Sequence, residues 1–215
     1  MRAAYYNTHE CAEVEEVGPG WADHRPRRVG RVTNPTLALI NHSCEPNYAR
    51  VSRGNTTYGF ASRTIPKGAE ILDTYCKPVA VAAREERQRY LAKYNFTCGC
   101  RACRGNWPTL AAMPSQLAGL PPSCYNQPPN KVEAQVKRVE RAEDAVRKAG
   151  RKGAGSEVVG RLVALVEEVH KLVKAPHHAI SYWEDQLHQA LLHQHAAKVT
   201  TITSGLSTVT WPAGP

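Results

Sequence analysis

Apolar residues in the last third of the chain recur at intervals of three and four, which is the spacing of amphipathic helices. The first set comprises Val132, Val136, Val139, Ala142 and Val146. The second follows the helix cap Ser156 and comprises Val159, Leu162, Val163, Val166, Val169 and Val173. The third follows Pro176 and comprises Ile180, Trp183, Leu187, Leu191 and Leu192. Successive helices with short connections predict an α-helical, tetratricopeptide-like region over residues 131–199.

The first part of the chain has patterns typical of strands and turns. The apolar run at residues 36–40 predicts a buried strand. Residues 56–62 and 71–76 are β-prone and lie on either side of a Pro- and Gly-containing turn, so we expect them to pair as a hairpin. Residues 1–34 contain Gly-Pro-Gly and a stretch rich in Arg and Pro, which predicts loop.

Changes in composition predict the domain boundaries. Residues 1–83 form the strand-rich part, and residues 84–107 combine helix-forming residues with a cysteine cluster. Residues 108–130 are rich in proline and predict a linker before the helical region at 131–199. Residues 200–215 are rich in Thr, Ser, Gly and Pro, which predicts a disordered tail.

Composition excludes some classes of protein and partner. An apolar fraction of 42% with 22% charged residues is typical of a globular protein, and no apolar run approaches the roughly 18 residues of a membrane span. The N-terminus lacks the apolar stretch of a signal peptide, so we expect a cytoplasmic and/or nuclear protein. The net charge of +9 is scattered rather than gathered with aromatics, which does not favour a nucleic-acid partner.

Three of the seven cysteines stand in a C-x-C-x2-C cluster formed by Cys98, Cys100 and Cys103. Three thiols within six residues converge readily on one tetrahedral ion, and zinc is the natural occupant in a reducing compartment. The alternative is three unrelated buried or free cysteines. A closed site needs a fourth ligand, for which the sequence offers Cys11, Cys44, Cys76, Cys124 and nine histidines.

The second motif is Asn-His-Ser-Cys-Glu-Pro-Asn at residues 41–47. It follows an apolar run directly, and its polar groups are costly to bury without partners. If Cys44 joined the cysteine cluster, one ion would pin the end of that run to a distant loop and hold Asn41 and His42 beside the metal.

Together these motifs resemble the SET domain of protein-lysine methyltransferases. The matching elements are the motif at 41–47, the strand that ends in Tyr75, and the Y-x-F-x-C-x-C-x2-C pattern at 94–103, which is similar to the SET and MYND branch. Within that branch, the member with tetratricopeptide repeats is the most similar. The resemblance implies an α+β fold: the C-terminal half of a mostly β SET domain, a zinc-bound post-SET loop and a helical C-terminal region.

The resemblance also implies roles for individual residues. S-adenosylmethionine and one structural Zn²⁺ are the implied cofactors, and Tyr75 is the implied catalytic residue. The implied contacts of S-adenosylmethionine are Asn41, His42, Tyr75, Phe96 and Asn7, and Tyr94 would line the channel for the substrate lysine. The implied zinc ligands are Cys44, Cys98, Cys100 and Cys103. The alternatives are that the aromatic residues are core packing and that His42 satisfies a buried backbone group.

The chain also departs from the family pattern. The family's cofactor pocket includes an N-terminal half of the SET domain with a Gly-rich turn and an inserted MYND zinc module, and neither precedes residue 41. We therefore interpret the chain as an N-terminally truncated protein-lysine methyltransferase that acts on a protein substrate. The alternative is a non-catalytic, zinc-stabilised scaffold whose helical tail binds partner proteins.

Overall fold

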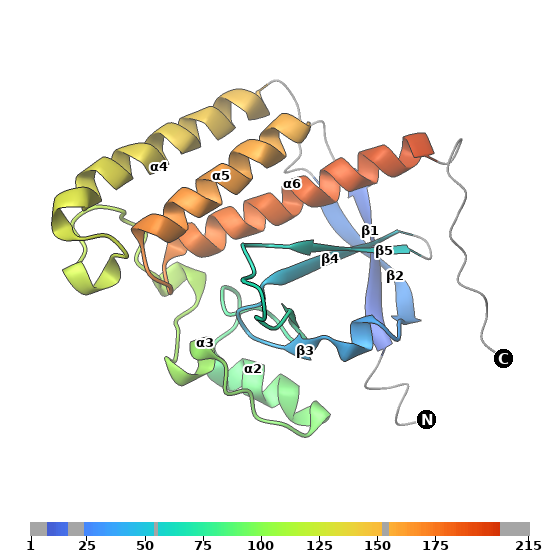
Figure 1. Cartoon of the computed structure of the whole chain (residues 1–215). Coiled ribbons are helices and arrows are strands. Elements are labelled where there is room, and N and C mark those ends of the chain that lie inside the picture. Colours follow the sequence, from blue (N-terminus) through green and yellow to red (C-terminus); the bar gives the residue numbers. More distant parts are fainter. Residues whose placement is uncertain (1–7, 17–23, 54–55, 152–154, 203–215) are drawn as a thin grey trace.

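The computed structural model describes residues 8–16, 24–53, 56–151 and 155–202. It is an α+β arrangement in which three long helices lie beside a set of short strand pairs (Figure 1). The last helix runs alongside the strands, and the short helices of the cysteine-rich segment lie on the other side of the strand region (Figure 1). Among the described helices, none has the length and apolar character that crossing a bilayer requires.

Two antiparallel strands, β1 (Thr8–Glu16) and β2 (His24–Thr33), correct the prediction of loop over residues 1–34. Their sequences are rich in charge and lack a clear apolar alternation, which hid them from pattern analysis. The register sets acidic positions opposite arginine positions: Glu10 with Arg31, Glu13 with Arg27, and Glu15 with Arg25.

The predicted hairpin between residues 56–62 and 71–76 is wrong. Strand β5 (Thr56–Ala61) pairs instead with β4 (Tyr48–Arg53), in antiparallel register. The other segment contributes only β6 (Leu72–Asp73), which pairs in parallel with β3 (Asn41–His42). The Asn47 side chain favours this pairing, because its Nδ2 donates to the Glu70 carbonyl (2.9 Å) and its Oδ1 accepts from the Leu72 N–H (2.8 Å).

The apolar run at residues 36–40 is a short 3₁₀ helix, η1 (Leu37–Leu39), and not the predicted strand. The side chain of Asn34 accepts hydrogen bonds from the backbone N–H groups of Thr36 (3.0 Å) and Leu37 (3.2 Å), which stabilises a turn in place of extended backbone. Leu37 is buried, whereas Leu39 is 82% exposed, so only one of the two leucines contributes to a core.

The cysteine-rich segment is built on short helices, as the sequence predicts. Helix α2 (Arg84–Leu91) continues into η2 (Ala92–Tyr94), which ends at Asn95 in the left-handed conformation (φ 60°). Helix α3 (Arg101–Arg104) follows the first two cysteines of the cluster.

Residues 108–130 contain two 3₁₀ turns, η3 (Leu110–Ala112) and η4 (Pro122–Cys124). This stretch packs on the helical region through Tyr125, which is buried and donates its hydroxyl to the Leu117 carbonyl (3.1 Å). Asn126 donates its backbone N–H to the Leu172 carbonyl at 2.9 Å. The proline-rich stretch is therefore ordered against the C-terminal helices.

Helices α4 (Pro129–Gly150), α5 (Ser156–Leu172) and α6 (His178–Ile202) confirm the helical periodicity of the last third. They lie side by side with α5 in the middle (Figure 1). The shared core is apolar and includes Val139, Val146, Leu162, Leu165, Val166, Val169, Leu172, Ile180 and Leu187. The likeness to tetratricopeptide repeats stays a prediction, and residues 203–215 of the predicted tail lie outside the described residues.

Candidate functional site

Four thiols from two distant segments converge at the base of the strand region. The Sγ atoms of Cys44, Cys98, Cys100 and Cys103 all lie within 4.8 Å of one another. Cys44 Sγ lies 3.9 Å from Cys98 Sγ and 3.5 Å from Cys103 Sγ. Ligands of a tetrahedral ion at about 2.3 Å would be about 3.8 Å apart. The donor set and its spacing therefore fit one zinc ion, with Cys44 as the fourth ligand.

Hydrogen bonds among these thiols shift their pKa values in opposite directions. Hydrogen bonding with Cys44 lowers the pKa of Cys100 to about 3, whereas hydrogen bonds from Cys100 and Cys76, with burial, raise the pKa of Cys44. Burial raises the pKa of Cys98 to about 11. Each of these hydrogen bonds favours the charge on one thiol of a pair and disfavours it on the other. A divalent cation would allow all four to become thiolates.

A buried arginine lies beside the thiols. The Arg87 guanidinium has no exposed surface, donates through Nη1 to the Ala82 carbonyl (2.6 Å) and reaches Cys103 Sγ through Nη2 (3.6 Å). Its Nε has no hydrogen-bond partner among the described residues. Burial alone would lower the pKa of Arg87, but hydrogen bonds with Cys103 and Cys44 outweigh it and raise the pKa. A buried cation needs a counter-charge, which four thiolates around one Zn²⁺ would supply.

The neighbouring Gln88 fixes the cysteine loop. Its Nε2 donates to the Cys98 carbonyl (2.8 Å) and to Cys103 Sγ (3.4 Å), and its Oε1 accepts from the Cys98 N–H (3.0 Å). Sequence analysis missed both residues, because a charge-rich helix gives no signal that Arg87 is buried or that Gln88 is half-buried. Groups that support metal ligands in this way tune metal affinity.

His42 connects the thiols to Tyr75. Its Nδ1 accepts a hydrogen bond from the Tyr75 backbone N–H (2.9 Å), so the ring proton belongs on Nε2, which lies 3.4 Å from Cys44 Sγ. The side chain therefore does satisfy a backbone group, as one alternative proposed, and its other nitrogen points at a candidate metal ligand. Asn41 is exposed, and its amide donates to the Glu70 carboxylate at 2.6 Å.

Three aromatic residues gather around His42. The Tyr75 ring centroid lies 5.3 Å from those of His42 and Tyr94 and 6.5 Å from that of Phe96, which is itself 5.9 Å from His42. The Tyr75 hydroxyl donates to the Ile40 carbonyl at 2.5 Å. Burial, with Asp73 and Tyr94 nearby, raises the pKa of Tyr75, so its hydroxyl stays neutral. Phe96 is 37% exposed, so part of its ring surface is accessible.

The remaining predicted site residue, Asn7, lies outside the described residues. The structure thus brings together the four cysteines as one set and His42, Tyr75, Tyr94 and Phe96 as another. The two sets share a boundary at His42 and Cys44.

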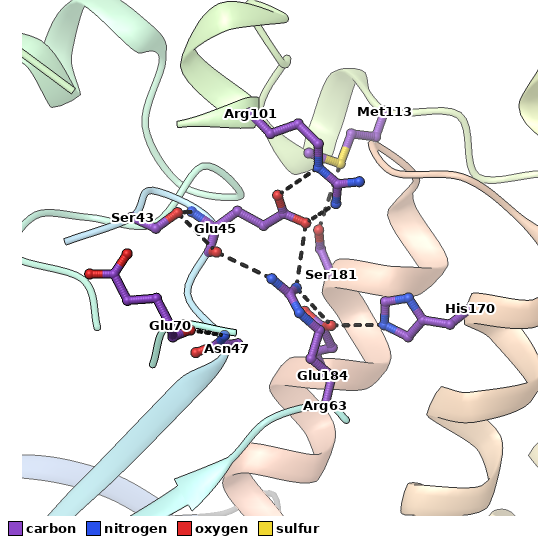
Figure 2. Close-up of polar contacts among 10 residues, drawn as sticks. All are labelled: Ser43, Glu45, Asn47, Arg63, Glu70, Arg101, Met113, His170, Ser181 and Glu184. Atoms are coloured by element: carbon purple, nitrogen blue, oxygen red, sulfur yellow. Dashed lines mark hydrogen bonds and ion pairs between the residues drawn. The ribbon is translucent and has the colours of Figure 1, made fainter. Parts of the chain in front are cut away.

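An ionic network connects this region to the helices (Figure 2). Glu45, which follows the candidate ligand Cys44, pairs with Arg101 of α3 (2.5 Å) and with Arg63 (3.4 Å). Arg63 also pairs with Glu184 of α6 (3.4 Å). The Glu184 carboxylate in turn lies 2.9 Å from Nε2 of His170 on α5. Sequence analysis missed these residues, because the partners are far apart along the chain.

A cavity of about 710 Å³ lies between the strand region and α6. Pro46, Tyr48 and Asp73 line one side, and Ile180 and His188 line the other. Thr74, which precedes Tyr75, also lines the cavity, so a ligand there would contact both parts of the molecule.

Comparison with known proteins shows what part of this chain is similar to. The model of the SET domain matches residues 6–76. The chain is 32% identical over 122 residues to the human protein-lysine N-methyltransferase SMYD4, which covers 55% of the chain and 15% of that protein. It is 29% identical over 101 residues to the Xenopus laevis N-lysine methyltransferase SMYD2-A, covering 47% of the chain and 23% of that protein. It is 34% identical over 94 residues to the mouse histone-lysine N-methyltransferase SMYD3, covering 43% of the chain and 19% of that protein.

The SET-domain match includes the motif at 41–47 and extends through Tyr75. The chain spans less than a quarter of the length of each of these three relatives. The chain thus carries SET-domain sequence over residues 6–76 and is similar to SET and MYND domain protein-lysine methyltransferases.

Proposed function

We propose that this chain forms part of an S-adenosylmethionine-dependent protein-lysine methyltransferase, with one structural zinc ion. The observation that carries the proposal is the link made by His42, which holds the backbone of Tyr75 at one ring nitrogen and faces the thiol of Cys44 at the other. An aromatic pocket is thereby fixed to a metal-binding cluster. SET-domain sequence over residues 6–76 and the named activities of the relatives support the assignment.

Zinc would be held by Cys44, Cys98, Cys100 and Cys103. Its role is structural, because four thiolates close the coordination shell and leave no open position for a substrate. The ion would tie the end of β3 to the loop before α3, segments that lie more than 50 residues apart. Phe96 and Tyr94 lie just before this loop, so the ion would also fix their positions.

S-adenosylmethionine supplies a methyl group on a positively charged sulfur. Phe96 would stack on its adenine, and Asn41 and the backbone of His42 would bind its polar groups. Aromatic faces suit a cationic ligand, because their quadrupoles attract positive charge.

The neighbouring tyrosines suit the amine that accepts the methyl group. A substrate lysine must be neutral to act as a nucleophile, and partly buried aromatic walls disfavour its ammonium form by desolvation. Tyr94 would line the channel through which the lysine enters. The neutral Tyr75 hydroxyl would orient the amine for in-line transfer, so its contribution is one of positioning.

Calorimetric titration of the zinc-loaded chain with S-adenosylmethionine tests the cofactor site. We expect micromolar binding, and we expect Phe96→Ala to weaken it. Retained zinc without any binding would restrict the enzymatic function to a longer polypeptide and favour the alternative, a non-catalytic scaffold.

Methyl transfer tests the role of Tyr75. In a version of the protein that transfers methyl groups to a protein substrate, Tyr75→Phe should abolish turnover and leave cofactor binding unchanged. Tyr90→Phe is the matched control, because Tyr90 is 46% exposed on α2 and lies outside the aromatic cluster. Unchanged turnover in Tyr75→Phe would refute the assignment.

The scaffold function has a separate basis in the helical region. Helices α5 and α6 expose Val163 (42%) and Tyr182 (39%), which partner proteins would cover.

We place the protein in the cytoplasm and/or nucleus, because a thiolate zinc site is stable in a reducing compartment.

A further inference from the structure

A fifth sulfur lies against the candidate metal centre without belonging to it. Cys76 Sγ, Cys44 Sγ and His42 Nε2 lie within 4.8 Å of one another. His42 Nε2 is 4.0 Å from Cys76 Sγ and 3.4 Å from Cys44 Sγ. Cys44 is thus shared between the four-thiol set and a second group that contains Cys76.

Cys76 is the thiol that a tetrahedral ion would leave free. Cys44, Cys98, Cys100 and Cys103 complete four-coordinate zinc, so the metal would not protect Cys76. Cys76 is half-buried, whereas Cys44 and Cys103 have no exposed surface. A small oxidant would therefore reach Cys76 before it reached the sulfur atom of its neighbour Cys44.

We propose that Cys76 is a peroxide-sensitive thiol that, once oxidised, forms a disulfide with Cys44 and opens the metal centre. The proposal goes beyond methyl transfer and rests on the zinc site described above. The two sulfur atoms lie no more than 4.8 Å apart, and a disulfide bond requires about 2.05 Å. Rotation of the side chains and a small movement of the loop can close this distance. Cys76 lies in the loop after β6, outside any helix or strand.

The chemistry balances with a peroxide as the oxidant. The Cys76 thiolate attacks one oxygen of hydrogen peroxide, the O–O bond breaks, and Cys76 becomes a sulfenic acid while hydroxide leaves and is protonated to water. The Cys44 sulfur then attacks the sulfenic sulfur, and a second hydroxide leaves as water. Two thiolates, one peroxide and two protons give one disulfide and two waters. A dithiol reductant reverses the reaction.

The disulfide would remove one of four zinc ligands, so zinc would dissociate. The consequence extends to the aromatic pocket, since Cys76 follows Tyr75 and His42 faces both sulfurs. Oxidation would therefore couple loss of the metal to displacement of the residue proposed to orient the substrate amine.

The experiment treats the purified, zinc-loaded chain with hydrogen peroxide. Zinc release is followed with a chromogenic chelator, and cysteine pairing is mapped by mass spectrometry of proteolytic peptides. We expect release of the ion together with a Cys44–Cys76 crosslink, and recovery after a dithiol and fresh zinc. Cys76→Ser should slow release by at least about tenfold, because the reactive thiol is gone.

Cys124→Ser is the matched control, because Cys124 is also half-buried but belongs to neither donor group. It should respond to peroxide like the wild type. Zinc content before oxidation shows whether Cys76→Ser folds, and Cys76→Ala serves if it does not.

Equal rates of zinc release in wild type and Cys76→Ser would overturn the proposal, as would crosslinks confined to Cys98, Cys100 and Cys103. A chain that never retains zinc would contradict the metal centre itself. Peptide mapping of that chain would still decide whether Cys76 pairs with Cys44. Neither readout depends on methyl transfer, so failure here and failure of the proposed activity are separable.

Discussion

The helical region and the site region are held together by different forces. The core shared by α4, α5 and α6 consists almost entirely of apolar side chains, with Leu162, Leu165 and Val169 inaccessible to solvent. The core beneath the aromatic pocket is smaller, and Cys44, Cys98 and Cys103 are among its buried members. Arg87 is also buried there, so the same volume contains a full charge.

The difference shows what each region requires to stay folded. Burial of apolar area stabilises the helices without a ligand, because the driving force scales with the area removed from water. In the site region, the buried Arg87 guanidinium is costly to remove from water, and metal-bound thiolates would supply the negative charge that compensates it. The site region should therefore depend on metal, and the helical region should not.

Metal removal should produce the largest effect. Structural zinc binds to small domains with an apparent free energy of about 10–16 kcal/mol, which is comparable to the whole stability of a domain. Chelation, or Cys100→Ser, should unfold residues around the site and leave α4–α6 helical. Zinc content, limited proteolysis and hydrogen exchange of α5 would measure this, with Cys124→Ser as the control. Full retention of zinc by Cys100→Ser would contradict the assignment.

A cavity in the helical core should destabilise the helices and leave the metal site intact. Leu162→Ala removes a fully buried side chain and should cost about 2–5 kcal/mol in the free energy of unfolding of the helices. Zinc content should not change. Val163→Ala is the neighbouring control, because Val163 is 42% exposed and its truncation should cost much less. Loss of zinc from Leu162→Ala would show that the two regions fold as one unit.

The two regions also differ in how far their sequences predicted them. The helices were found from the spacing of apolar residues alone, since the hydrogen bonds that form α4 and α5 join residues only four apart in the sequence. The strand at 56–62 was also found, as β5, but the strand pairing was not. Partners such as β3 and β6 are distant along the chain, and beside them the Asn47 side chain accepts from the Leu72 backbone N–H, 25 residues later. Nothing in local composition specifies such a pairing.

The site was predicted in part, for a related reason. The Cys98–Cys103 cluster is local and was found directly, whereas Cys44 as its partner came from the family resemblance. The geometry then brought Cys44 within 4 Å of Cys98 and Cys103. Burial of Arg87 had no local signal, because its helix reads as solvent-exposed at nearly every position.

Removing the buried charge should have an intermediate effect. Arg87→Met deletes the cation that faces the thiols, so zinc affinity should fall by about 10–100-fold, the size seen for groups that support metal ligands. Arg87→Lys keeps the charge and should recover part of the loss. Arg89→Met is the control, because Arg89 is exposed on the same helix. Affinity is measured by competition with a chelator of known strength, and unchanged affinity in Arg87→Met would show that its charge is balanced elsewhere.

The smallest expected effect is the part of the helical region's pH dependence that arises at His177. This residue is 2% exposed; its Nδ1 accepts from the Ala179 N–H (3.1 Å), and its Nε2 donates to the Gln116 carbonyl (3.1 Å). Burial lowers the pKa of His177 below 6.5. The unfolded chain therefore takes up a proton at a higher pH than the folded chain. The contribution of neutral His177 to the free energy of unfolding is complete above pH 6.5. It is lost as the pH falls from 6.5 towards the pKa of His177 in the folded chain.

The measurement is the difference in free energy of unfolding between wild type and His177→Gln from about pH 7.5 to about pH 5.5. The difference is needed because burial also lowers the pKa of His188, and because zinc binding itself depends on pH. Both contributions are common to the two proteins and cancel. We expect the wild type to lose stability more steeply on acidification, since glutamine does not titrate. Parallel pH profiles would mean that His177 accepts a proton in the folded state without cost, and that the junction of α6 with residues 108–130 is open to water.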